Sequence, residues 1–170
     1  MSSKSFIDMF GDVALKETRT VTISEDRPGG LPANDYGFDE WYCVDPACDC
    51  RRVLFFVLAH HGKGHVATIS HSFDPPGKRS LVREQTFLDP LLPQSHLAEE
   101  LLQLCKDVLV SDPAYCGRLE RHYRMVKDAI ADPDHPCQEL LNDSDRDRAA
   151  KVARARAILP PKRRGNRKWR

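Results

Sequence analysis

The stretch EWYCVDPACDCRRVLFFV, residues 40–57, holds three cysteines within eight positions and then continues as an apolar segment. Aromatic and β-branched residues on both sides of the cysteines predict two strands, at residues 36–44 and 52–59. The Asp45-Pro46 pair between them is typical of a turn, which brings Cys43 back towards Cys48. The stretch therefore predicts two strands with a cysteine-containing loop between them.

Further strands are expected on both sides of this stretch. Residues 18–24 alternate and are rich in β-branched side chains, and the sequence HHGKG, residues 60–64, is typical of a hairpin turn before a strand at 65–73. Helical spacing of apolar residues predicts a short helix near the N-terminus and three later helices, at residues 95–110, 111–132 and 144–159. Strands followed by helices predict an α+β fold, a small antiparallel sheet with a cysteine zinc knuckle followed by packed helices.

Length and composition are those of one globular domain with a tail. The chain has 170 residues, of which 41% are hydrophobic and 30% charged. We expect one α+β domain over residues 1–140, with the zinc knuckle at 43–50, and a basic helix and flexible tail over 141–170. The longest apolar run, residues 53–59, is far shorter than the roughly 20 residues that span a bilayer, and the N-terminus does not resemble a secretory signal. A cytoplasmic protein is expected, where cysteines stay reduced.

The spacing C-x4-C-x-C favours a metal site. Residues two apart in an extended chain point the same way, so Cys48 and Cys50 can bind one ion, and the turn adds Cys43. Zinc binds thiolates at about 2.3 Å. The adjacent Arg51 and Arg52 offset the negative charge of three thiolates. We interpret the three cysteines as ligands of Zn²⁺.

Other roles for these cysteines stay open. A disulfide between Cys48 and Cys50 would close a very small strained ring. A catalytic thiol needs a base, and the loop contains no histidine. Oxidation of Cys48 and Cys50 with release of the metal would make the site a redox sensor.

Tetrahedral zinc takes a fourth ligand, or water at an open position. We predict His122 as that ligand, although a histidine on the apolar face of its helix is also typical of a hydrogen-bonded core residue. Cys116, Cys137 and His71 are weaker candidates, and Cys105, within a leucine stripe, is expected to be a core residue.

A resemblance to a group of proteins adds to this interpretation. YCVDPACDCRRVLFFV, with LDPLLPQS and DPAYCGRLERHY downstream, resembles an uncharacterised bacterial family with a Y-C-x-[DE]-P-x-C-D-C-R-R-V motif. The resemblance covers roughly residues 5–130. It implies a coherent bacterial domain marked by CDCRR and RHY, and it implies no reaction. The knuckle is also similar in style to the C-terminal zinc motif of the bacterial secretion ATPase, which has a different spacing.

The charge is distributed unevenly along the chain. Residues 145–170 contain eleven Lys/Arg and two acidic residues, whereas the other 144 residues contain fifteen Lys/Arg and twenty-three acidic residues. Basic tails commonly contact nucleic acid or an acidic protein partner, and an aromatic side chain can stack on an exposed base. The candidate nucleic-acid contacts are Arg163, Arg164, Arg167, Lys168 and Trp169. A solvated basic terminus, or one that touches the acidic body, is the alternative.

The sequence thus predicts a zinc-binding, non-enzymatic domain that contacts nucleic acid or a ribonucleoprotein through its tail. No phosphate-binding loop, dinucleotide fingerprint or hydrolase motif occurs. The competing hypotheses are a zinc- or thiol-dependent enzyme, with water at an open metal position, and the redox sensor.

Overall fold

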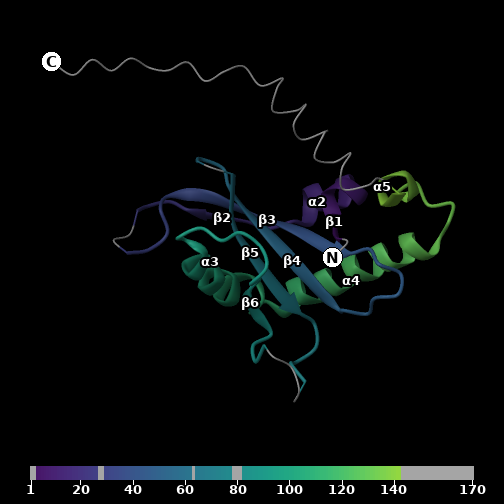
Figure 1. Ribbon diagram of the computed structural model, residues 1–170. Helices are drawn as coiled ribbons and strands as arrows, with labels where there is room; N and C mark the ends of the chain where they lie inside the picture. Colours follow the sequence, from purple (N-terminus) through teal and green to yellow (C-terminus); the bar gives the residue numbers. More distant parts are fainter. Residues whose placement is uncertain (1–2, 27–28, 63, 78–81, 143–170) are drawn as a thin grey trace.

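One antiparallel sheet of six strands forms the centre of the molecule (Figure 1). The computed structural model describes residues 3–26, 29–62, 64–77 and 82–142. The strands are β1 (Ser3–Ser5), β2 (Thr20–Ile23), β3 (Asn34–Cys43), β4 (Arg52–Ala59), β5 (Gly64–Ser72) and β6 (Thr86–Leu88). The sheet order is β1-β3-β4-β5-β6, and β2 also pairs with β3.

Two strands share one edge of β3. β1 pairs with its C-terminal end, with Ser3 opposite Cys43, and β2 pairs with its N-terminal end, with Ile23 opposite Asn34. Between them the chain leaves the sheet and forms α1 (Phe6–Met9) and α2 (Gly11–Glu17). Of these two helices, α1 packs against β3.

Alternation along β3 decides which residues enter the core. Tyr36, Phe38, Glu40 and Tyr42 are all fully buried, whereas the intervening residues are half-buried. This is the period of two that a strand with one buried face shows. A glutamate thus takes a core position between aromatic residues.

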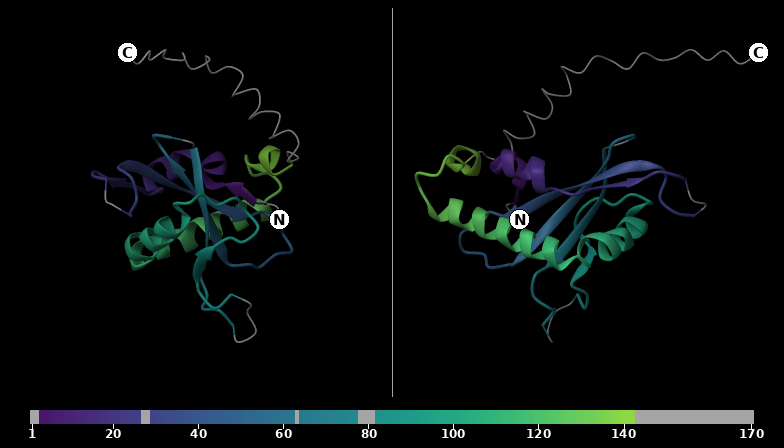
Figure 2. Two further views of the ribbon diagram at one scale, coloured as in Figure 1. Left: turned by 60° about the vertical axis from the view of Figure 1, so that its left-hand side comes forward. Right: turned by 180° about the vertical axis from the view of Figure 1, so that it is seen from behind.

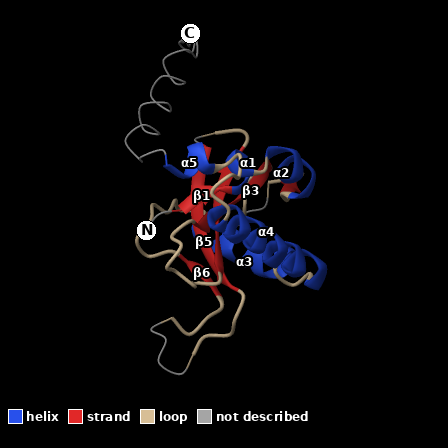
Figure 3. Ribbon diagram, turned by 90° about the vertical axis from the view of Figure 1, so that its right-hand side faces the viewer, coloured by secondary structure: helices blue, strands red, loops and turns tan. Residues whose placement is uncertain are grey.

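The remaining helices follow the last strand. They are α3 (Ala98–Leu104), η1 (Cys105–Leu109), α4 (Pro113–Ala131) and α5 (Gln138–Asn142). Among them, α3 and α4 pack on one side of the sheet (Figure 3). α4 runs diagonally across the strands (Figure 2, right). Its buried residues recur at spacings of three and four, and they begin with Tyr115, Leu119 and His122. α4 thus contributes most of the side chains that reach the core from the helical layer.

The structure confirms the α+β fold with an antiparallel sheet followed by helices. Asp112 caps α4, because its Oδ1 accepts from Ala114 N at 3.0 Å and Pro113 is the first helical residue. The predicted helix 95–110 is instead split into α3 and a π-helical turn. The strands β1 and β6 were not predicted. Each has only three residues, and each is extended because it pairs with a neighbouring strand, β3 or β5. The tail predicted over 141–170 lies, from residue 143 on, outside the described residues.

No helix in the described ranges combines the length and the apolar character that crossing a membrane requires.

Candidate metal centre

Cys43, Cys48 and Cys50 come together at the end of β3. Cys43 is the last residue of the strand, and the other two lie in the loop that leads to β4. Their sulfur atoms all lie within 4.8 Å of one another, and all three cysteines are free. Zinc bound at about 2.3 Å in tetrahedral geometry separates its sulfur ligands by about 3.8 Å. The cluster is therefore close to the geometry of a three-cysteine metal site.

A turn brings the cysteines together. Asp45 Oδ1 accepts from Ala47 N at 2.9 Å, and Cys48 N donates to Asp45 O at 3.2 Å. Pro46, between them, favours the turn conformation. The chain reversal predicted from Asp45-Pro46 is confirmed, and it places Cys48 beside Cys43.

Side chains from α4 hold the loop against the body of the protein. Lys127 Nζ donates to Asp45 O at 3.1 Å and to Cys48 O at 2.7 Å. Tyr123 Oη donates to Asp49 Oδ1 at 3.3 Å. Because α4 packs on the sheet, these bonds fix the loop relative to Cys43 at the strand end.

The second half of the loop is fixed by the residues that follow β5. Arg51 has a positive φ of 39°, an unusual conformation for a residue with a side chain. Its carbonyl accepts from Phe73 N at 2.9 Å, and its Nε donates to Asp74 Oδ2 at 2.7 Å. These contacts direct the chain from Cys50 into β4.

The thiols of Cys48 and Cys50 differ in their acidity. Hydrogen bonds from Cys43 and Cys50 lower the pKa of Cys48, and the positive charge of Lys127 adds to this. Burial raises the pKa of Cys50 to about 12, and the neighbouring cysteines contribute to this rise against the nearby charge of Arg52. Cys48 is thus the thiol that ionises before Cys50, and a bound cation would favour the thiolate form of Cys50 at neutral pH.

His122, predicted as the fourth ligand, does not join this cluster. Its Nδ1 lies 2.7 Å from Glu40 Oε2, and its Nε2 lies 2.8 Å from Glu17 Oε2. Its ring stacks on Phe6 with the centroids 4.1 Å apart. Both ring nitrogens are therefore committed to carboxylates, which corrects the prediction. The alternative stated for this histidine, a hydrogen-bonded core residue, describes its position, with carboxylates as its partners.

The polar cluster around His122 was not expected from the sequence. The fully buried carboxylate of Glu40 accepts from Tyr42 Oη at 2.9 Å and from Tyr115 Oη at 3.0 Å, in addition to its contact with His122. Burial, followed by the charge of Glu40, raises the pKa of both tyrosines. The signal was present in β3, because alternation places Glu40 on the same face as Tyr36, Phe38 and Tyr42.

Glu17 completes this cluster at the protein surface. Its carboxylate contacts His122 and pairs with Arg118 and Arg121. The hydrogen bond with His122, together with the charges of the two arginines, lowers the pKa of Glu17. His122 and Glu40 are fully buried, and the cluster joins α2, α4 and β3.

The other cysteine and histidine candidates lie elsewhere. Cys105 is fully buried in the core, as predicted. The thiol of Cys116 donates to Val110 O at 3.3 Å, and that of Cys137 donates to Met9 O at 3.1 Å. His71 Nδ1 lies 2.8 Å from Thr86 Oγ1. Among the described residues, none of these joins the three-cysteine cluster.

The candidate nucleic-acid contacts lie outside the described residues. These are Arg163, Arg164, Arg167, Lys168 and Trp169.

Comparisons with protein-family models, with curated proteins and with solved structures gave no match to this chain. The resemblance to the bacterial family with the cysteine motif stays a prediction, and the candidate site rests on its own geometry.

Proposed function

We propose that this chain is a zinc-binding, non-enzymatic interaction module in which Cys43, Cys48 and Cys50 hold one Zn²⁺. The observation that carries the proposal is the convergence of three sulfur atoms within 4.8 Å at the junction of β3 and its loop. Thiolates are soft ligands, and they favour zinc over magnesium or calcium. The ion would join the loop to the strand end and so stabilise the fold.

The charges around the cluster support a metal with several thiolates. Arg52 Nε is buried and has no hydrogen-bond partner among the described residues, and its charge acts on Cys50. Lys127 adds a second cation beside Cys48. Zn²⁺ with three thiolates carries a net charge of −1, which these cations offset. A buried polar atom such as Arg52 Nε is costly without a partner.

A second candidate function rests on the number of ligands. In the described part of the chain, the cluster comprises these three cysteines and no fourth His, Cys, Asp or Glu. Zinc with three protein ligands commonly holds a water molecule, whose pKa it lowers. This arrangement favours a zinc-dependent hydrolytic enzyme as the alternative to the interaction module.

The partner of the module, in this proposal, is nucleic acid bound through the C-terminal segment. The support is the clustering of eleven Lys/Arg in residues 145–170, together with Trp169. Contacts of this kind are made to phosphates, so they weaken steeply with salt and carry little sequence preference. An aromatic residue among the cations adds stacking on an unpaired base.

The metal is tested by elemental analysis of the full chain, purified without a histidine tag under reducing conditions. We expect one zinc per chain, lost in Cys48→Ser and retained in Cys116→Ser. Cys116 is a matched control because it is also a half-buried cysteine but bonds to Val110 O. Absence of zinc from the wild-type protein would refute the proposal.

Nucleic-acid binding is tested by titrating a fluorescent single-stranded oligonucleotide with the full chain at several salt concentrations. The logarithm of the binding constant falls linearly with the logarithm of the salt concentration. Replacing Arg163, Arg164 and Arg167 with glutamine should make this slope shallower by about 0.7 for each phosphate that is no longer neutralised. Arg124→Gln, an exposed cation on α4, serves as the control. Equal binding by the triple variant would exclude the tail as the binding segment.

A further inference from the structure

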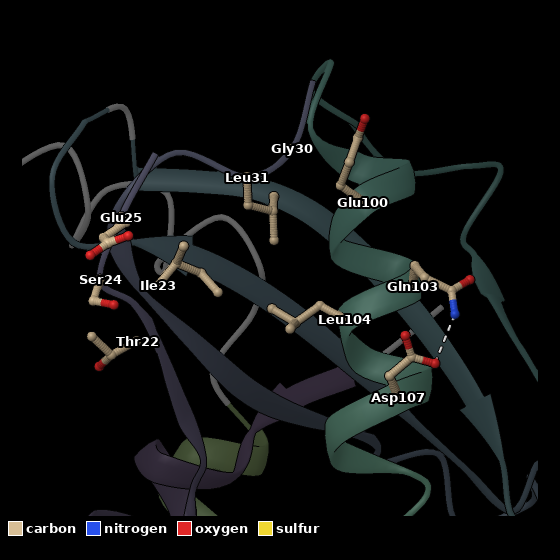
Figure 4. Close-up of a pocket in the computed structure, with 10 residues that line it drawn as sticks. All are labelled: Thr22, Ile23, Ser24, Glu25, Gly30, Leu31, Glu100, Gln103, Leu104 and Asp107. Atoms are coloured by element: carbon tan, nitrogen blue, oxygen red, sulfur yellow. Dashed lines mark hydrogen bonds between the residues drawn. The ribbon is translucent and has the colours of Figure 1, made fainter. Parts of the chain in front are cut away.

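A groove between β2 and α3 is distinct from the candidate metal centre. It has a volume of about 410 Å³. One wall comes from β2 and the loop before β3, and the other comes from α3 and η1 (Figure 4). None of the described residues that line it has a role in the proposed metal or nucleic-acid binding.

The bottom of the groove is apolar. Ile23 and Leu31 face Leu104 across the space between the two walls (Figure 4). Ile23 and Leu104 are half-buried, so part of their apolar area remains in contact with water. A ligand with apolar side chains would remove this area from water, at roughly 25 cal/mol per Å².

The margin of the groove is acidic. Glu25, Glu100 and Asp107 lie around it, and no Lys or Arg is among the described residues that line it. The Oε2 atom of Glu100 is buried and has no hydrogen-bond partner in the described ranges. A cation on the ligand would provide that partner. The groove therefore fits a segment that combines basic and apolar side chains.

The chain itself contains such a segment. Residues 146–159, RDRAAKVARARAIL, combine five Lys/Arg with Val152, Ile158 and Leu159, and they contain one acid. We propose that this segment binds in the groove of its own chain, with its apolar residues against Leu104 and its cations beside Glu25, Glu100 and Asp107. This is independent of the proposed zinc and nucleic-acid binding.

The length of the chain permits this contact. The described part ends at Asn142, and 28 residues follow. Leu159, the last residue of the segment, lies 17 residues beyond Asn142. An extended chain spans about 3.3 Å per residue, so the segment reaches up to about 56 Å from Asn142, whereas a domain of this size has a radius of gyration of only about 15 Å. Tethering also gives the segment an effective concentration in the millimolar range.

Two other ligands of the groove have to be considered, a nucleic acid and the same segment of a second copy of the chain. A nucleic acid would be repelled by the acidic margin, whereas residues 146–159 are attracted to it. The same segment of a second copy has the same chemistry but lacks the advantage of tethering at low protein concentration. The experiment has to separate these two cases.

The proposal is tested by photo-cross-linking in the full chain. Ser24→p-benzoylphenylalanine places the cross-linker at the exposed margin of the groove, and Asp128→p-benzoylphenylalanine on exposed α4 is the control. An equal mixture of ¹⁴N- and ¹⁵N-labelled protein is irradiated, and cross-linked peptides are identified by mass spectrometry. We expect cross-links from position 24 to residues 146–159 with a single isotope label.

Charge variants establish whether the cations guide the segment. Glu100→Lys should lower the cross-linking several-fold, and adding Arg154→Glu should restore part of it. Circular dichroism verifies that each variant is folded. Molar salt, where the Debye length is about 3 Å, should also lower the cross-linking. Peptides with mixed labels would assign the groove to a second copy and overturn the proposal. Cross-links to other segments, or no excess over position 128, would also overturn it.

Discussion

The Nδ1 atom of His122 lies 2.7 Å from Oε2 of Glu40, and neither side chain has any exposed area. Glu40 comes from the central part of β3 and His122 from the middle of α4, so this contact joins the sheet to the helix that covers it. Phe6 of α1 stacks on the imidazole ring. His122 thus belongs to the core rather than to the candidate metal centre.

His122→Ala should destabilise the protein and leave metal binding intact. Removing one partner of a buried hydrogen bond typically costs about 1–3 kcal/mol, and more where the group left behind is charged, because that group stays buried without compensation. We expect a loss of this size in urea unfolding monitored by circular dichroism. Zinc content at low urea should remain at one per chain.

His96→Ala is the control for this experiment, because His96 is exposed. We expect it to unfold as the wild-type protein does. A folded His122→Ala protein that had lost its zinc would contradict the assignment of this histidine to the core.

Glu17 should make stability depend on pH. Its pKa in the folded protein is lowered from 4.5 by the hydrogen bond with His122 and by the charges of Arg121 and Arg118. A carboxyl group with a lowered pKa contributes stability above its unfolded pKa, and loses it as the pH falls through the folded value. The free-energy difference between wild type and Glu17→Gln should therefore be constant near neutral pH and shrink below about pH 4.5.

Urea unfolding of both proteins across this range measures the difference. Glu139→Gln is a suitable control, since Glu139 is an exposed glutamate in α5. A difference between Glu17→Gln and wild type that grows on acidification would refute the assigned direction of the pKa shift.

The sequence could predict the four longer strands and the cysteine cluster, because both depend on local patterns. Cys43, Cys48 and Cys50 are close in the chain, and Asp45-Pro46 supplies the turn that joins them. The site of His122 could not be predicted in this way. Its two partners lie 82 and 105 residues away, so only the packing of α2, α4 and β3 brings them together.

The short strands show the same limit. β1 and β6 contain three residues each, which is too few for a recognisable alternation. They are strands because β3 and β5 offer hydrogen-bonding partners. Glu40 is the exception, since the alternation of aromatic residues around it in one strand is a local pattern from which a buried carboxylate could have been predicted.

Cobalt substitution should reveal the coordination of the metal. Co²⁺ bound by three thiolates is expected to show sulfur-to-metal charge transfer and the intense visible bands of tetrahedral cobalt. Each of Cys43→Ser, Cys48→Ser and Cys50→Ser should weaken the charge-transfer band, whereas Cys105→Ser should leave it unchanged, because Cys105 lies within the core.

The same spectra distinguish the two candidate functions. If the fourth position holds water, added cyanide or a small thiol should shift the visible bands, and the zinc enzyme would be favoured. If a protein group fills it, the bands should not respond, as expected for a structural site. Octahedral bands with no charge transfer would rule out a three-cysteine site.

Lys127 should control metal affinity without binding the metal. Its ammonium group holds the carbonyls of Asp45 and Cys48, so Lys127→Met releases the loop while keeping the length of the side chain. Removing an outer-sphere partner typically costs about 10- to 100-fold in metal affinity, and we expect zinc affinity to fall within this range in competition with a chromophoric chelator. Arg124→Met is the matched control, since Arg124 is an exposed cation on the same helix that bonds to its own helix, at Glu120 O. If both variants bound zinc equally, the anchoring of the loop by α4 would have no part in assembling the site. A selective loss of affinity in Lys127→Met, with the unfolding midpoint of the zinc-free proteins unchanged between the two variants, would show that the helix preorganises the three cysteines.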